Sequence, residues 1–186
     1  MEVFIVLGSR NPEGQTAQAA DALAAGVAER GGEVERAFLP LLDIQRCRQC
    51  NERGWGQCRD EGSCVIEDDF AAVVDRIRAA DAAVFVTPVY FGDLSESMRA
   101  FTDRLRRITR HDHGKAGVEG KLAVGICVAG GGGGGAPNCC LSLERTLTTT
   151  GFRLVDVVPV RRQNLTHKTS VLRATGAWLA AGAPET

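Results

Sequence analysis

Aromatic residues, net charge and long apolar runs are all scarce in this sequence. Phe, Trp and Tyr make up 5% of the 186 residues, so a hydrophobic core has to be built mainly from Ala, Val and Leu. A formal net charge of −1 argues against nucleic acid or an anionic membrane as a main partner. The apolar runs are too short to span a bilayer, and Met1 enters a strand-like run without a charged leader. We therefore expect a cytoplasmic protein with no nucleic-acid and no membrane partner.

The remaining composition suits a globular α/β domain. With 44% hydrophobic residues the chain can bury a core, and its length predicts a single domain over residues 1–186. Apolar runs typical of strands cover Val3–Leu7, Val34–Phe38, Ala82–Thr87, Leu122–Val128 and Leu154–Val160. Helical patterns alternate with them and cover Thr16–Arg30, Phe70–Ala79, Ser95–Ile108, Cys140–Thr150 and Thr169–Ala181. This alternation predicts a parallel sheet with helices on both faces.

The segment Gly8–Thr16 is the first of three unusual loops that follow predicted strands. It places Gly and hydroxyl residues directly between a strand and a helix. Unpaired backbone N–H groups and the positive end of the helix dipole favour a phosphate group at such a point. A polar turn that ends in a helix cap at Thr16 is the alternative. The loop is neither a Walker A loop, because no Lys follows Gly14, nor a G-x-G-x-x-G fingerprint.

The second and third loops are as unusual as the first. Tyr90 and Phe91 lie side by side directly after a buried strand, where a flat apolar ligand would explain them. The alternative is that both rings cover the end of the core. The third loop contains six consecutive glycines, Gly130–Gly135, which let a backbone approach a ligand closely, unless the run is only a flexible segment. Because the carboxyl ends of parallel strands share one edge of a sheet, we expect the three loops to meet there.

Three blocks of this sequence resemble the flavodoxin-like NAD(P)H-dependent FMN reductase family, and within it the iron–sulfur flavoproteins. The blocks are Gly8–Thr16, Cys64–Asp69 and Thr87–Arg104, within a resemblance that covers about residues 1–160. The resemblance implies a flavodoxin-like three-layer sandwich with five parallel strands in the order 2-1-3-4-5. It also implies FMN as cofactor, NAD(P)H as reductant and a homodimer in which the partner chain helps to cover the flavin.

The same resemblance implies a set of flavin-binding residues in the three loops. The FMN phosphate would be held by Ser9, Arg10, Asn11, Gln15 and Thr16. The ribityl chain and the ring would lie along Pro88, Val89, Tyr90, Phe91 and Gly92, with the pyrimidine edge of the ring facing Gly130, Gly131 and Gly132. Because the flavin supplies the chemistry, we expect no side chain to be catalytic.

Four of the seven cysteines lie within residues 39–67, a long segment that has no clear secondary-structure pattern. Their spacing is C-x2-C-x7-C-x5-C, at positions Cys47, Cys50, Cys58 and Cys64. Four thiolates suit a [4Fe–4S] cluster or a tetrahedral zinc ion, and free redox-labile thiols are the third possibility. Iron–sulfur flavoproteins resemble this chain here, with a more compact motif in the same place. Cys127 is expected in the core, and Cys139-Cys140 at a helix start serve packing or, alternatively, form a reactive site.

Three functions from different classes follow from these observations. The first is an NAD(P)H-dependent reductase that passes electrons through FMN to a small acceptor such as a flavin or a quinone. The second is an iron–sulfur electron carrier, with a cluster at the four cysteines and a ferredoxin-like donor. The third is a redox sensor that uses the thiols. The sequence favours the first and leaves the other two open.

Overall fold

Five parallel strands form the central sheet of the computed structural model, which describes residues 1–182. Residues 183–186 of the expected domain lie outside the described part. The strands are β1 (Glu2–Leu7), β2 (Glu33–Phe38), β3 (Ala82–Tyr90), β5 (Leu122–Ala129) and β6 (Arg153–Arg161). They lie side by side in the order β2-β1-β3-β5-β6, and every neighbouring pair among them is parallel. Counted among the parallel strands alone, this is the predicted order 2-1-3-4-5.

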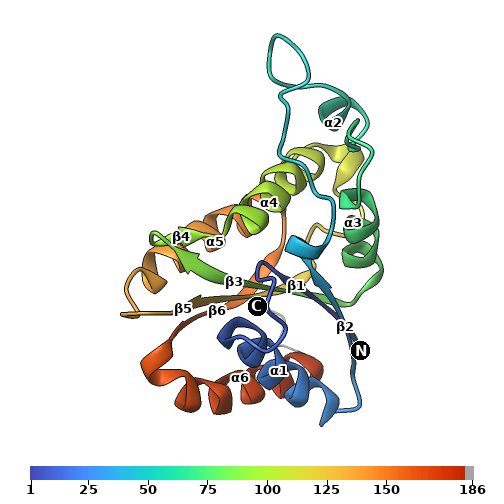
Figure 1. Ribbon diagram of the computed structural model, residues 1–186. Helices are drawn as coiled ribbons and strands as arrows, with labels where there is room; N and C mark the ends of the chain where they lie inside the picture. The colour runs from blue at the N-terminus through green and yellow to red at the C-terminus, as the bar shows by residue number, and fades with distance from the viewer. Residues whose placement is uncertain (183–186) are drawn as a thin grey trace.

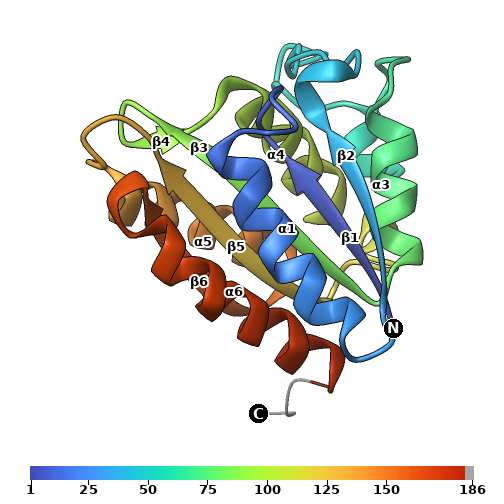
Figure 2. The ribbon, with the colours of Figure 1, turned by 60° about the horizontal axis from the view of Figure 1, so that its bottom comes forward.

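Helices cover both faces of the sheet and complete a three-layer sandwich (Figure 1). One face carries α1 (Gln15–Ala28) and α6 (Leu165–Ala180), which lie side by side in Figure 2. The other face carries α3 (Phe70–Ala79), α4 (Glu96–Thr109) and α5 (Ala136–Thr150). This arrangement confirms the predicted fold class.

Two apolar cores result, one on each face of the sheet. Side chains of β1, β3 and β5 alternate between them, so that Ile5 packs toward α1 and α6 while Phe4 packs toward α3 and α4. Helices α1 and α6 approach each other closely at Gly26 and Gly176. A Cβ atom on Gly176 would lie 2.0 Å from the carbonyl oxygen of Leu23, so only glycine fits there.

The structure differs from the sequence-based elements mainly at their ends. Strand β3 continues three residues past Thr87 to Tyr90 and turns back into a short antiparallel strand, β4 (Asp93–Leu94). Helix α5 begins at Ala136 rather than Cys140, because Gly135 ends the preceding loop in the left-handed conformation. Helix α6 likewise begins four residues before Thr169, and α1 begins at Gln15.

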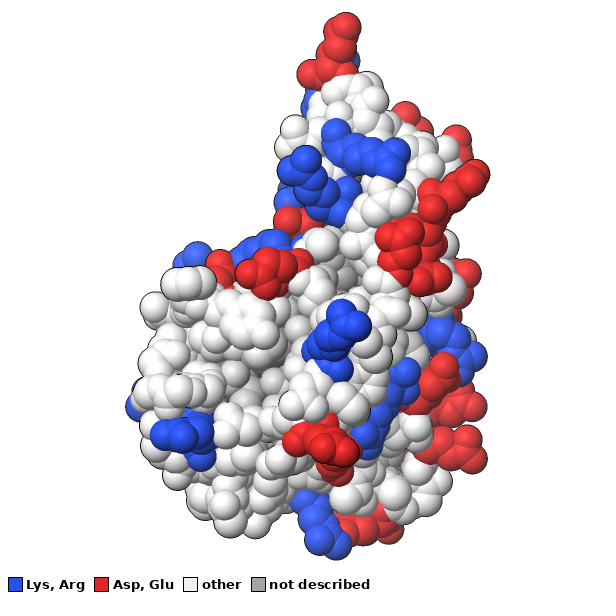
Figure 3. Space-filling view, viewed as in Figure 1, with Lys and Arg blue, Asp and Glu red and all other residues white. Residues whose placement is uncertain are grey.

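The cysteine-containing segment projects beyond the sheet (Figure 1). It holds the 3-10 turn η1 (Leu39–Leu41) and one short helix, α2 (Gln57–Asp60), and it packs against α4. Two further 3-10 turns, η2 (Asp112–Gly114) and η3 (Arg162–Asn164), follow α4 and β6. Figure 3 shows charged side chains gathered on this projecting part and along one side, with a broad uncharged area on the body below it. Within residues 1–182, no helix has the length and apolar character that crossing a membrane requires.

Candidate functional site

The three unusual loops meet at the carboxyl edge of the sheet, as predicted. They enclose an open pocket of about 400 Å³ between the ends of β1, β3 and β5. Its lining residues are Ser9, Asn11, Gly14, Gln15, Thr16, Pro88, Val89, Tyr90, Val128, Ala129, Gly130, Gly131 and Gly134. Most of the predicted flavin-binding residues are therefore brought together. Those outside the lining are Arg10, Phe91, Gly92 and Gly132.

The first loop presents the start of α1 to this pocket. The helix begins after Gly14, whose carbonyl accepts the Gln18 amide, so the amides of Gln15, Thr16 and Ala17 have no partner within the helix. The helix cap is Gly14 and no side chain caps the helix, so the alternative of a cap at Thr16 is wrong. Free amides and the positive end of the helix dipole favour an anion at this point.

A buried hydrogen-bond network fixes the first loop to the second. The Gly8 amide donates to the Val86 carbonyl at 2.8 Å, and the Ser95 hydroxyl donates to the Gly8 carbonyl at 2.9 Å. The Ser95 amide in turn donates to the Thr87 hydroxyl at 3.2 Å. A Cβ atom on Gly8 would lie 2.5 Å from the Ser95 hydroxyl oxygen, so the close approach needs glycine. These bonds hold the first loop against β3 and the start of α4.

The second loop is a tight turn that exposes both of its aromatic rings. Tyr90 pairs with Asp93 across the β3–β4 hairpin, and the two residues between them, Phe91 and Gly92, have φ of 50° and 80°. Phe91 is fully exposed and Tyr90 is 47% exposed, so the alternative that they cover the core is wrong. A non-glycine residue with positive φ costs about 1–3 kcal/mol and is typical of functional sites.

The glycine loop folds into a turn with an internal hydrogen bond. Gly131, Gly133 and Gly135 all have positive φ, and the Gly133 amide donates to the Gly130 carbonyl at 2.8 Å. A Cβ atom on Gly135 would lie 2.6 Å from the Cα atom of Gly92. The glycine loop and the aromatic turn are therefore in direct backbone contact, which only glycine at position 135 permits.

The four predicted metal-binding cysteines line a second pocket, between the projecting segment and α4. Cys47, Cys50, Cys58 and Cys64 all contribute to its wall, together with side chains from α4. Within residues 1–182, no three His, Cys, Asp or Glu side chains converge closely enough to hold a metal ion. The space enclosed by this lining is about 20 Å³. The donor set itself, four thiols with no competing carboxylate, fits an iron–sulfur cluster or zinc.

Arg104 of α4 is the buried cation that holds this pocket together. Its guanidinium forms a bidentate ion pair with Asp68, with Nη1 2.6 Å from Oδ2 and Nη2 2.9 Å from Oδ1. Both side chains are essentially unexposed. Nη1 also donates to the Gln45 carbonyl at 3.0 Å, and Nη2 donates to the Cys64 sulfur at 3.3 Å. The Phe70 ring lies 4.0 Å beneath the guanidinium carbon. Arg104 thus joins both ends of the cysteine segment to α4.

The charges in this network are set by these contacts. Burial raises the pKa of Asp68, but hydrogen bonds from Arg104 and the Gln45 amide, with the Arg104 charge, bring it below its ordinary value. Burial lowers the pKa of Arg104, but its bonds to Asp68 and Cys64 raise it above its ordinary value. Both groups are therefore charged. Asp68 lies in the sequence block Cys64–Asp69 and Arg104 in the block Thr87–Arg104. Nothing in the two blocks shows that these residues pair.

A second arginine of α4 contacts residues 51–57, which lie between Cys50 and Cys58. The Arg107 guanidinium carbon lies 4.2 Å from the centre of the Trp55 ring, and Nη2 donates to the Gly54 carbonyl. Trp55 in turn meets His111 edge-on, with ring centres 5.3 Å apart. Residues 51–57 are therefore packed against α4 by specific contacts.

The other three cysteines form a cluster beneath the glycine loop. Cys127 and Cys139 are buried in the core, and Cys140 is half-buried beside them. Hydrogen bonds with Cys139 and Cys140, together with burial, raise the pKa of Cys127. The hydrogen bond from Cys127 lowers the pKa of Cys140. Cys127 is thus the predicted core residue, and Cys140 is the half-buried thiol of the group, with a lowered pKa.

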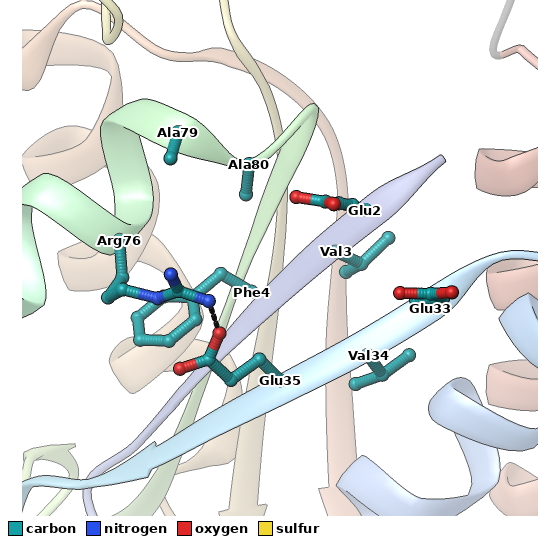
Figure 4. Close-up of a pocket in the computed structure, with 9 residues that line it drawn as sticks. All are labelled: Glu2, Val3, Phe4, Glu33, Val34, Glu35, Arg76, Ala79 and Ala80. Carbon is teal, nitrogen blue, oxygen red and sulfur yellow. Dashed lines mark ion pairs between the residues drawn. The ribbon is translucent and has the colours of Figure 1, made fainter.

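A further pocket lies at the opposite end of the sheet and has none of these features. It has a volume of about 130 Å³. Figure 4 shows its lining residues at the amino ends of β1 and β2 and the end of α3. Its principal polar contact, the ion pair between Glu35 and Arg76, is satisfied within the wall. Because ligands of open α/β sheets bind at the carboxyl ends of the strands, the three-loop pocket is the stronger candidate.

Comparison with known proteins decides the family. The profile of a family described as NADPH-dependent FMN reductase matches residues 1–164. The chain belongs to this family. That membership confirms the family predicted from the sequence.

Curated proteins similar to this chain include iron–sulfur flavoproteins. An iron–sulfur flavoprotein of Methanocaldococcus jannaschii is 32% identical to this chain, in an alignment that covers 70% of this chain and 65% of the flavoprotein. An iron–sulfur flavoprotein of Methanosarcina thermophila is 36% identical over 41% of this chain and 37% of its own length. The chain therefore spans less than two thirds of the length of these curated relatives.

The solved structures that match confirm the fold. An NAD(P)H:quinone oxidoreductase from Methanothermobacter marburgensis aligns over 100% of this chain and 99% of its own, with a TM-score of 0.74 and 20% identity. A flavone reductase aligns over 98% of this chain and 63% of its own, with a TM-score of 0.72 and 20% identity. At this identity the match shows a flavodoxin-like fold and nothing finer, and flavodoxins are among the matching structures.

Proposed function

We propose that this protein is an FMN-dependent oxidoreductase that takes electrons from NAD(P)H and passes them to a small acceptor such as a flavin or a quinone. The pocket where the three loops meet carries this proposal. Its phosphate end would be the start of α1, with Ser9, Asn11, Gln15 and Thr16 around the free amides. The family match supports FMN as the occupant.

The remaining loops supply the surroundings for a flat ring. Pro88, Val89 and Tyr90 offer an apolar wall, and Gly130 and Gly131 bring backbone close without side chains in between. FMN, when bound, accepts a hydride and releases its electrons one or two at a time. The chain's own contribution is to orient the ring, exclude water and direct N–H groups toward it. No side chain in this pocket has to transfer a proton.

The exposed Phe91 supports the predicted homodimer. Phe91 is fully exposed beside the half-exposed Tyr90, so the turn at the rim of the pocket presents an apolar surface. A second copy that covers this turn would bury the ring and close the flavin pocket. We propose a homodimer on this basis, and sedimentation of the native protein beside Phe91→Ala tests it. Equal, monomeric sedimentation of both proteins would refute it.

A reaction and a binding measurement test the proposed function together. The purified protein should contain FMN and should oxidise NAD(P)H when a quinone or free flavin is added. Ser9→Asp places a negative charge at the phosphate end and should yield protein without flavin. Ser170→Asp makes the same change on the exposed surface of α6 and should keep its flavin. Full flavin occupancy in Ser9→Asp would contradict the assigned phosphate site.

The four-cysteine pocket favours a second element of this function. Four thiols line one pocket, and the similar curated proteins are iron–sulfur flavoproteins. We propose that these thiols hold a [4Fe–4S] cluster that exchanges single electrons with FMN, and that a ferredoxin-like protein is an alternative donor. Cys58→Ala should lower the iron content, whereas Cys127→Ala, in the core, should leave it unchanged. Equal iron in wild type and Cys58→Ala would exclude Cys58 as a ligand.

A further inference from the structure

We propose that Arg104 tunes the reduction potential of the four-cysteine centre by donating a hydrogen bond from Nη2 to the sulfur of Cys64. The inference rests on the proposed iron–sulfur centre and assigns a role within it to a residue that is not a ligand. Arg104 is therefore a positioning residue, not a catalytic one.

The direction of the Arg104 side chain is fixed independently of Cys64. Asp68 binds both terminal nitrogens, and the Gln45 carbonyl accepts from Nη1. These three contacts fix the plane of the guanidinium, which lies over the Phe70 ring. The remaining N–H of Nη2 then points at the Cys64 sulfur at 3.3 Å, with the Ile66 carbonyl farther away at 3.5 Å. A rigid fork of this kind is specific to arginine.

The surroundings make this hydrogen bond effective. Arg104 is 1% exposed and Asp68 is unexposed, so water does not screen the contact. Hydrogen bonds donated to the sulfurs and nearby positive charge raise the reduction potential of an iron–sulfur cluster, because they stabilise the more negative, reduced state. The Arg104–Asp68 pair has no net charge, but its positive end faces the sulfur. Arg104 should therefore favour reduction of the cluster.

The experiment is a redox titration of anaerobically purified protein, with the reduced cluster followed by electron paramagnetic resonance so that flavin absorbance does not interfere. Three variants are compared with the wild type. Arg104→Lys keeps the charge and loses the fork. Arg104→Gln with Asp68→Asn removes both charges and leaves no unpaired ion in the core. Arg106→Gln is the matched control, because Arg106 lies on the same helix and is 41% exposed.

We expect the cluster potential to fall in the double variant, to fall less in Arg104→Lys and to stay at the wild-type value in Arg106→Gln. Equal potentials in the wild type and both Arg104 variants would overturn the inference. Loss of iron from both Arg104 variants, with folding and flavin retained, would also overturn it, since Arg104 would then only hold the loop. Absence of iron from the wild type would overturn the proposed centre itself, which separates the two failures.

Discussion

Replacing Gly135 by alanine tests the contact between the glycine loop and the aromatic turn. Gly135 has φ of 81°, and its added Cβ atom would lie 2.6 Å from the Gly92 Cα atom and 3.2 Å from the Gly92 nitrogen. A left-handed conformation costs a non-glycine residue about 1–2 kcal/mol. Relieving an overlap with backbone atoms costs about 1–3 kcal/mol more. We therefore expect Gly135→Ala to lower the free energy of unfolding by roughly 2–5 kcal/mol.

Thermal unfolding of the flavin-loaded and flavin-free protein measures this effect. For a chain of this size each 1 kcal/mol shifts Tm by about 2–4 °C, so Tm should fall by roughly 4–20 °C. Flavin affinity should fall as well, because the turn that carries Tyr90 has to move. Gly134→Ala is the matched control for the Tm of the flavin-free protein, since its Cβ atom would meet nothing within 4 Å. Equal Tm values for the two variants would refute the contact.

Three further predictions follow from other parts of the structure. Because the pKa of Asp68 is held below 3.8, its contribution to stability is complete above that pH and lost as the pH falls through the lowered value. Asp68→Asn should therefore show a smaller loss of urea stability between pH 7 and pH 3 than the wild type; an equal loss would contradict the pairing. Iodoacetamide should modify Cys140 before Cys127 and Cys139, as followed by peptide mass spectrometry, and equal labelling of Cys127 would argue against the thiol cluster. Gly176→Ala should lower the free energy of unfolding by about 1–3 kcal/mol, because its Cβ atom would overlap the Leu23 carbonyl, and an unchanged calorimetric Tm would show that α1 and α6 can separate without cost.

Local patterns were sufficient to predict a parallel sheet with helices on both faces, and the family resemblance supplied the strand order. Apolar runs and helical spacing identified the five parallel strands and the main helices, and the three loops after β1, β3 and β5 were predicted to meet. The ends of elements were less accurate, since they depend on tertiary contacts. Helix α5 starts at Ala136, directly after the left-handed Gly135. Gly135 also packs on Gly92, a contact between segments more than 40 residues apart that sequence spacing does not show.

The contacts that hold the site in place were the least predictable part of it. Arg104 and Asp68 each lay within a sequence block that resembles the family, but they are separated by 36 residues and only the fold brings them together. The turn at Phe91 was recognised as unusual, yet its exposure depends on the β3–β4 hairpin. The sequence signal that could have indicated the pair is the position of Arg104 on the apolar face of α4, at helical spacing from Phe101 and Ile108. A cation on such a face requires a partner.

A visible spectrum of protein purified without oxygen, with flavin, iron and zinc quantified on the same sample, tests whether the chain holds both FMN and a cluster. We expect flavin bands with one FMN per chain, together with a broad shoulder and about four irons per chain. Flavin without iron or zinc would retain the FMN pocket and remove the cluster from the account. A colourless protein that takes up no FMN when it is supplied would contradict the account at its centre.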